Sequence, residues 1–138
     1  MDDLNRYMNN VSTISSLRER VQNLVNLKEE YLSLDKVVIL SAVEMEDSRR
    51  VTDEYKNSID RNDTLLDLIM EIKNEIFKIK LIKESLDRNT QAGLSQIKIV
   101  DNLINILRDI LDILNDERSK LDRVVRYYEK SFSYYNSF

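Results

Sequence analysis

Residues 97–135 read IKIVDNLINILRDILDILNDERSKLDRVVRYYEKSFSYY, and apolar side chains recur in them at alternating steps of three and four. Such heptad spacing places all of its members on one side of an α-helix, so it predicts a long helix with coiled-coil character. The series has a single gap, at Arg118. Its members are Ile97, Val100, Ile104, Leu107, Leu111, Leu114, Leu121, Val125, Tyr128, Phe132 and Tyr135.

Two further apolar series share this spacing, one within residues 65–86 and a less regular one within residues 4–31. Additional apolar residues widen two of the stripes, as expected where a helix touches more than one neighbour. They are Leu66, Leu68, Met70 and Phe77, and Leu103, Ile106, Ile110 and Ile113. The pattern predicts an all-α fold: an elongated, antiparallel helical bundle of three to four helices with coiled-coil character and a long C-terminal helix.

The 138 residues include no proline and a single glycine, Gly93, so helix boundaries are expected from capping residues. We expect one domain over residues 1–138, because no Gly/Pro/Ser-rich linker divides the chain. We expect helix boundaries at caps near Ser33 and Thr64. A further boundary is expected at a turn over residues 89–93, with Gly93 in the left-handed conformation. The expected helices cover about 3–32, 35–61, 64–89 and 93–136.

If the cap near Ser33 fails, residues 3–61 become one helix and the product is an extended helical hairpin. In either case the last helix, at about 1.5 Å per residue, extends about 65 Å and exceeds its neighbours. We therefore expect its C-terminal part to project or to pair with another chain.

The composition removes most catalytic chemistries. Without histidine and cysteine the chain has no nucleophilic triad, no zinc site and no di-iron bundle site. One glycine is too few for a P-loop or a dinucleotide fingerprint, and no EF-hand loop occurs. We expect no enzymatic activity, no cofactor, no metal and no small-molecule substrate.

The net charge of −4 argues against nucleic acid as a partner, because such binding depends on many uncompensated Lys and Arg side chains. The lysine-rich stretch of residues 73–83 is interrupted by Glu75 and flanked by Glu71 and Glu84, and such mixed charge is typical of a solvated helix face. The longest apolar run, residues 37–40, falls far short of the roughly 18 residues of a membrane span. We expect a soluble intracellular protein with no transmembrane segment, either cytoplasmic or part of a viral or phage particle.

Aromatic residues are concentrated at the C-terminus. Six of the ten lie in the last twelve positions: Tyr127, Tyr128, Phe132, Tyr134, Tyr135 and Phe138. Because Tyr and Phe are typical interface anchors, this segment is a candidate docking site for a partner or a second copy. The alternative is that the rings close the end of the bundle within the same chain.

Arg118 occupies a core position of the strongest stripe, between Leu114 and Leu121. A charged core residue in a coiled coil fixes register and partner at a cost in stability. The alternative is a long side chain that extends its charged end to solvent.

These features favour a non-enzymatic structural or interaction subunit that joins protein partners in a homo- or hetero-oligomer by helix-in-groove packing. The expected anchors are Leu111, Leu114, Leu121, Val125, Tyr128 and Phe132. One alternative is a compact monomeric inhibitor or adaptor that acts through an acidic face formed by Glu44, Glu46, Asp47, Asp53 and Glu54. A second alternative is a peripheral membrane-remodelling protein.

Overall fold

The computed structural model describes the backbone of residues 2–136 and the side chains of residues 8–132. Within these residues the chain forms three α-helices and one short 3-10 turn, and no strand. In chain order the elements are α1 (Asp2–Ser33), η1 (Glu44–Glu46), α2 (Ser48–Glu84) and α3 (Gln91–Asn136). The all-α class and the bundle architecture predicted from the sequence are confirmed, with three helices.

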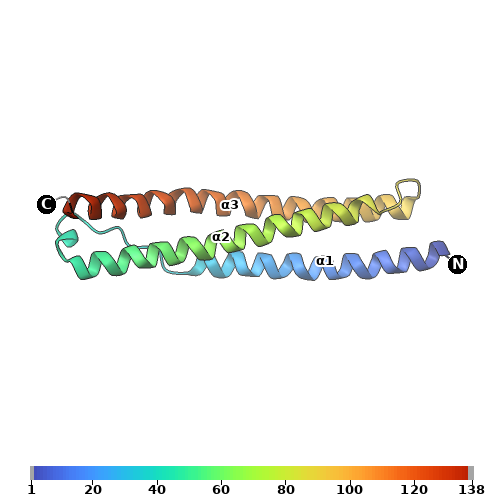
Figure 1. The fold of residues 1–138 in the computed structure, drawn as a ribbon. Helices are drawn as coiled ribbons and strands as arrows, with labels where there is room; N and C mark the ends of the chain where they lie inside the picture. The colour runs from blue at the N-terminus through green and yellow to red at the C-terminus, as the bar shows by residue number, and fades with distance from the viewer. Residues whose placement is uncertain (1, 137–138) are drawn as a thin grey trace.

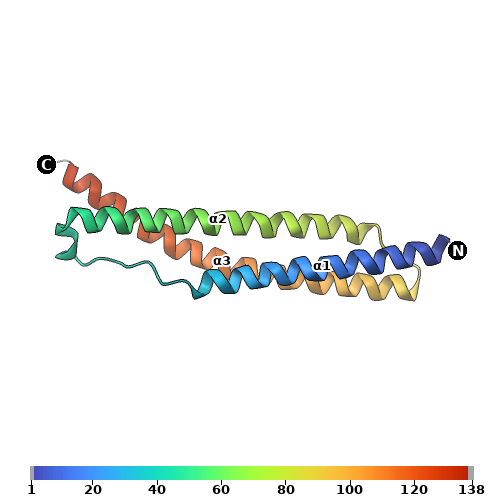
Figure 2. The same cartoon turned by 90° about the horizontal axis from the view of Figure 1, so that it is seen from below.

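The helices lie side by side in an elongated bundle, each antiparallel to the one before it (Figure 1). α2 and α3 pack against each other most extensively, and α1 contacts both of them (Figure 2). Two contacts show the register of α2 against α3: the 2.6 Å ion pair of Lys83 with Asp101, and the 3.3 Å hydrogen bond from the Tyr55 hydroxyl to Glu129. With 46 residues, α3 is about 69 Å long at 1.5 Å per residue.

The main hydrophobic core runs between all three helices, and its members recur at the predicted steps of three and four. Each fully buried aliphatic side chain contributes about 1.5–3 kcal/mol, so the core is the principal source of stability. Its buried members are Ile14, Leu17, Val21, Leu24, Tyr31, Leu65, Leu68, Ile69, Ile72, Ile76, Ile79, Leu86, Val100, Leu103, Ile104, Leu107, Ile110, Leu114 and Leu121. Among the helices described, none combines the length and the apolar character needed to cross a membrane.

α1 ends at Ser33, so the alternative of one helix over residues 3–61 is wrong. The Ser33 hydroxyl donates a 2.8 Å hydrogen bond to the carbonyl of Glu30, which satisfies an acceptor of the last turn. Residues 34–43 then leave the helix and run along the bundle toward its far end (Figure 2). We call this segment the strap.

The prediction of a helix over residues 35–61 is wrong in its first part, because the strap and η1 occupy residues 34–46. The run Val37-Val38-Ile39-Leu40 contains three β-branched residues, which favour extended backbone over helix. The helix that follows starts at Ser48 and is capped by Asp47, whose Oδ1 accepts hydrogen bonds from the backbone N–H groups of Arg49 and Arg50.

The predicted boundary at residues 62–64 is also wrong, since α2 continues unbroken from Ser48 to Glu84. Thr64 does not cap a new helix. Its hydroxyl donates a 3.0 Å hydrogen bond back to the carbonyl of Asp60, one turn earlier in the same helix. Burial of the apolar stripe on both sides of this position outweighs the local capping tendency.

The turn between α2 and α3 covers residues 85–90, and α3 begins slightly earlier than predicted. Thr90 caps α3: its hydroxyl accepts a 3.0 Å hydrogen bond from the N–H of Gly93. Gly93 does not adopt the left-handed conformation that we expected. A Cβ atom at this position would lie 1.8 Å from the carbonyl oxygen of Asp87, so the glycine is required by close approach of the turn.

At the far end of the bundle the strap takes the place that α1 occupies elsewhere, beside α2 and α3 (Figure 2). A second, smaller core forms there, which we call the tail core; it consists of Leu40, Met45, Val51 and Tyr128. The half-buried Tyr55, Val124 and Phe132 pack around it. The strap, α2 and α3 are therefore joined by their own apolar cluster beyond the end of α1.

Candidate interaction surfaces

The residues predicted to form an interaction site differ widely in exposure. Leu114, Leu121 and Tyr128 are buried in the chain's own cores. Leu111, Arg118, Val125 and Phe132 are half-buried, and Tyr127 is exposed by 40%. The side chains of Tyr134, Tyr135 and Phe138 lie outside the described residues. The expected helical anchors are therefore largely covered within one chain.

Tyr128 is the centre of the tail core and is fully buried. Its hydroxyl donates a hydrogen bond to the carbonyl of Val38 and accepts one, at 3.3 Å, from the N–H of Leu40. The neighbouring Tyr127 hydroxyl donates to the carbonyl of Leu40 at 3.2 Å. Because the strap is extended, these backbone groups have no hydrogen-bond partners within a helix. The hydroxyls of the two tyrosines are their partners instead. The tyrosines thus hold the strap against α3.

Three further ring contacts extend this cluster. Tyr55 of α2 lies edge-on to Phe132, with ring centroids 5.1 Å apart, and to Tyr128 at 6.5 Å. Tyr127 and Tyr128 are also edge-on, at 5.6 Å. Edge-to-face pairs of this kind contribute about 0.5–1.5 kcal/mol beyond burial. Through Phe132, the aromatic segment closes the end of the bundle in the same chain, and the expectation that the last helix projects alone is wrong up to that residue.

Three tyrosine hydroxyls, those of Tyr128, Tyr55 and Tyr31, have a raised pKa, which favours their neutral form. Burial raises the pKa of Tyr128, an effect that the hydrogen bond with Leu40 partly opposes. Burial also raises the pKa of Tyr55, with the nearby Glu129 carboxylate adding to the rise. Tyr31 at the end of α1 has a raised pKa for the same principal reason, although the Arg61 guanidinium, 5.8 Å from its ring, opposes the change.

The outer face of the strap exposes apolar side chains, most of which lie within residues 35–61, where the sequence predicted a helix. We call this set the strap surface: Leu34, Val38, Ile39 and Val43, exposed by 48%, 45%, 65% and 76%. Tyr127 is on the segment of α3 that bonds the strap. The signal that could have revealed an extended segment was the unbroken run of β-branched residues, which lacks any helical spacing of polar positions.

A second exposed apolar set lies on α2. Met70, Phe77 and Leu81 are exposed by 61%, 64% and 52%. They are seven and four residues apart, so at 100° per residue they fall within about 40° of one another. The buried residues of the same helix, such as Ile72 and Ile79, lie on its opposite side. We call the three exposed residues the outer stripe.

Arg118 occupies the predicted core position on α3, and the register of the helices places it level with Leu66, about one turn from Asn62. Its side chain is half-buried. The Nε atom of Arg118 and the Oδ1 atom of Asn62 are buried, and neither has a hydrogen-bond partner in the described part of the chain. Arg118 therefore enters the bundle interior with part of its polar group unsatisfied.

The acidic region considered for the adaptor alternative is partly used within the fold. Glu44 pairs with Arg50 at 2.9 Å and accepts a hydrogen bond from the N–H of Ser41. The hydrogen bonds with Ser41 lower the pKa of the Glu44 carboxyl, with Arg50 contributing further. Asp47 caps α2. Across residues 8–132, whose side chains are described, acidic side chains do not gather in groups of three that could hold a metal ion.

Comparison of the chain with protein-family models, with curated proteins and with solved structures finds no match.

Proposed function

We propose that the protein is a non-enzymatic structural or interaction subunit, which joins a homo- or hetero-oligomeric assembly by helix packing. The observation that carries the proposal is the outer stripe of α2. A partner helix laid along Met70, Phe77 and Leu81 would cover an apolar face that the three helices of this chain leave in solvent.

The geometry of α2 supports this proposal. The helix already buries one face against α1 and α3, yet its opposite face carries large apolar side chains at helical spacing. A soluble helix ordinarily has polar residues there. Clustered exposed apolar side chains are typical of interaction sites, and Met and Phe are enriched in the cores of interfaces.

The strap surface is a second contact area in this proposal. It lies beside the C-terminal part of α3, where the sequence predicted docking. The exposed apolar side chains there come from the strap and Tyr127. Ile39 and Val43 are the most exposed of them. An apolar partner at this end would also bury strap backbone.

The elongated form favours the assembly role over a compact adaptor. A self-contained globule of this length has a radius of gyration of roughly 14 Å, whereas α3 alone is about 69 Å long. The adaptor alternative keeps Glu46, Asp53 and Glu54 as its exposed or half-exposed acids, because Glu44 and Asp47 are engaged within the chain.

The substitution Phe77→Glu tests the proposal. It places a charge in the middle of the outer stripe without touching the core, so we expect normal helicity and loss of association. Sedimentation equilibrium of the purified chain detects self-association, and capture from the native source detects a different partner. Asn115→Glu adds the same charge at an exposed position of α3 and should retain the association. A wild-type chain that is monomeric and captures nothing would refute the proposal.

A further inference from the structure

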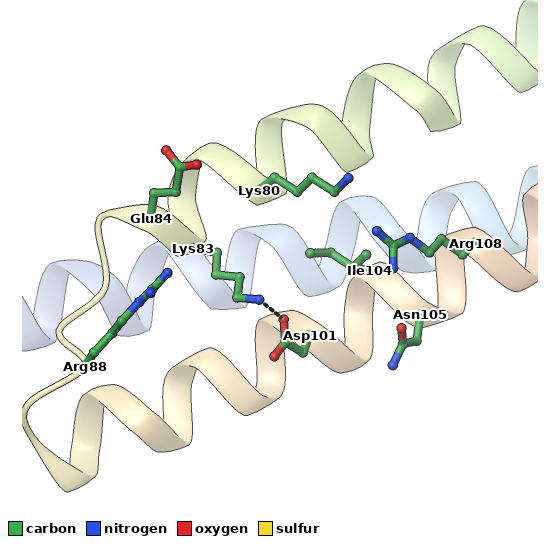
Figure 3. Close-up of a pocket in the computed structure, with 8 residues that line it drawn as sticks. All are labelled: Lys80, Lys83, Glu84, Arg88, Asp101, Ile104, Asn105 and Arg108. Carbon is green, nitrogen blue, oxygen red and sulfur yellow. Dashed lines mark ion pairs between the residues drawn. The ribbon is translucent and has the colours of Figure 1, made fainter.

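A cleft of about 470 Å³ lies between α2 and α3, close to the turn that joins them (Figure 3). It is lined by Lys80, Lys83, Glu84, Arg88, Asp101, Ile104, Asn105 and Arg108. Four of these eight residues are cationic and two are acidic. The volume is within the roughly 300–1,000 Å³ typical of small-molecule sites.

Among the side chains that the structure describes, three of the cations have no ion-pair partner. Lys83 is paired with Asp101 at 2.6 Å, which neutralises both. Lys80, Arg88 and Arg108 take part in none of the ion pairs formed by the described side chains. In Figure 3, Glu84 points away from α3, while Arg88 extends from the turn into the space between the helices. The cleft therefore has an uncompensated positive charge.

Lys80 and Arg108, the other two unpaired cations, converge from different helices. Lys80 extends from α2 and Arg108 from α3 into the same cleft (Figure 3). Like charges that face a common space repel each other, and a multivalent anion between them removes the repulsion. Arginine offers a planar set of donors that matches phosphate oxygens, and Asn105 adds an uncharged amide donor.

We propose that this cleft binds a small polyphosphate-type anion through Lys80, Arg88 and Arg108. A single carboxylate has too little charge to satisfy three cations, whereas linked phosphate groups present several charges and oxygens within one small ligand. The site uses side chains and needs no glycine-rich loop, so the scarcity of glycine does not oppose it. Lys80 and Lys83 line this cleft, whereas Lys73 and Lys78 of the same lysine-rich segment do not.

Bound anion would tie α2 to α3 near the turn, and ligand that binds only the folded chain raises its stability. Calorimetric titration of the full chain with sodium tripolyphosphate at low ionic strength measures binding directly, and a thermal melt measures the stabilisation. We expect saturable binding and an increase in melting temperature. If titration of the wild-type chain gives no binding, the proposal is wrong.

The double variant Lys80→Gln/Arg108→Gln should weaken tripolyphosphate binding about a hundredfold, because each charge-assisted contact is worth about one decade and the variant removes two of them. The matched control is Lys73→Gln/Lys78→Gln, which removes the same two charges from exposed positions of α2. We expect the control to keep its affinity within about twofold. Equal weakening in both variants would show diffuse attraction and overturn the site.

The same phosphate chemistry occurs on membrane lipids, so a second arm uses phosphatidylcholine vesicles that contain phosphatidylinositol bisphosphate. Binding of soluble tripolyphosphate that the cleft variant loses supports the proposal, whatever the vesicles do. Binding to vesicles with no binding of soluble tripolyphosphate overturns it and favours the peripheral membrane alternative.

Discussion

Gly93 lies in the first turn of α3, where the preceding turn of the chain leaves no space for a side chain. Substitution of glycine by alanine in an ordinary helix stabilises it by up to about 1 kcal/mol. Here the new Cβ would meet the carbonyl oxygen of Asp87, so we expect Gly93→Ala to lower the free energy of unfolding by about 1–3 kcal/mol. Urea unfolding measures this. Ser95→Ala, at an exposed position of the same helix, is the control, and a stabilised Gly93→Ala would contradict the described turn.

Tyr128 links the strap to α3 through its hydroxyl, and Tyr128→Phe removes that group while keeping the ring. We expect a loss of about 1–3 kcal/mol near neutral pH, because the backbone groups of Val38 and Leu40 lose their partner. Denaturant unfolding gives the value. An unchanged midpoint would show that the strap is held by apolar contacts alone.

The same residue predicts a pH dependence. Burial raises the pKa of Tyr128 above 10.0 in the folded chain, so the unfolded chain releases this proton first. Stability is therefore complete below about pH 10 and falls as the pH rises through the folded-state value. Tyr31 and Tyr55 act in the same direction, so the stability of Tyr128→Phe should still decline with pH. The decline should be shallower than in the wild-type chain, because one of the three raised groups is gone. Urea midpoints between about pH 8 and pH 11 test this, and identical slopes would contradict it.

Arg118 places a charged side chain where its neighbours along the stripe are leucines. Because its Nε atom is buried without a partner in the described residues, we expect Arg118→Leu to raise the free energy of unfolding by about 1 kcal/mol or more. If arginine also fixes register, the stabilised variant should form additional oligomeric species on size-exclusion chromatography with light scattering. A large destabilisation would instead show that the guanidinium is well satisfied.

At the scale of elements, the start of α2 depends on one cap. Asp47→Ala should cost about 1 kcal/mol, because the N–H groups of Arg49 and Arg50 lose their acceptor. Asp53→Ala removes the same charge from an exposed position inside the helix and is the control. Equal losses in the two variants, measured by urea unfolding, would show that only charge matters.

The helices could be predicted from the sequence where the local pattern agrees with the burial that the whole fold imposes. The stripe of α3 and the end of α1 near Ser33 were predicted within a few residues. The break before Thr64 failed because its hydroxyl is equally able to bond backward along a continuous helix. The strap was missed because a short apolar run is compatible with either helix or extended backbone.

The candidate sites were less predictable than the helices, because exposure depends on how three helices share their faces. The apolar series of α3 was correctly predicted to bury one side, yet Tyr127 and Tyr128 bond the strap, which no local pattern had indicated. Met70 and Phe77 were recognised as widening the apolar face of their helix. Only the packing shows that α1 and α3 leave them, with Leu81, in solvent.

For the whole molecule, the exposed apolar side chains are the feature that an isolated subunit does not explain. The outer stripe and the strap surface lie on separate parts of the elongated bundle, so one chain can contact a partner at more than one place (Figure 1). Larger contact area of this kind is typical of stable assemblies.

Capture of the tagged full-length chain from its native source, with the stoichiometry of bound proteins measured by mass spectrometry, tests the assembly role most directly. The wild-type chain should bring down a stoichiometric companion, either a second copy or another protein, and Phe77→Glu should release it while Asn115→Glu retains it. A wild-type chain recovered alone as a monomer, or a companion that stays bound to Phe77→Glu, would contradict association through the outer stripe of α2.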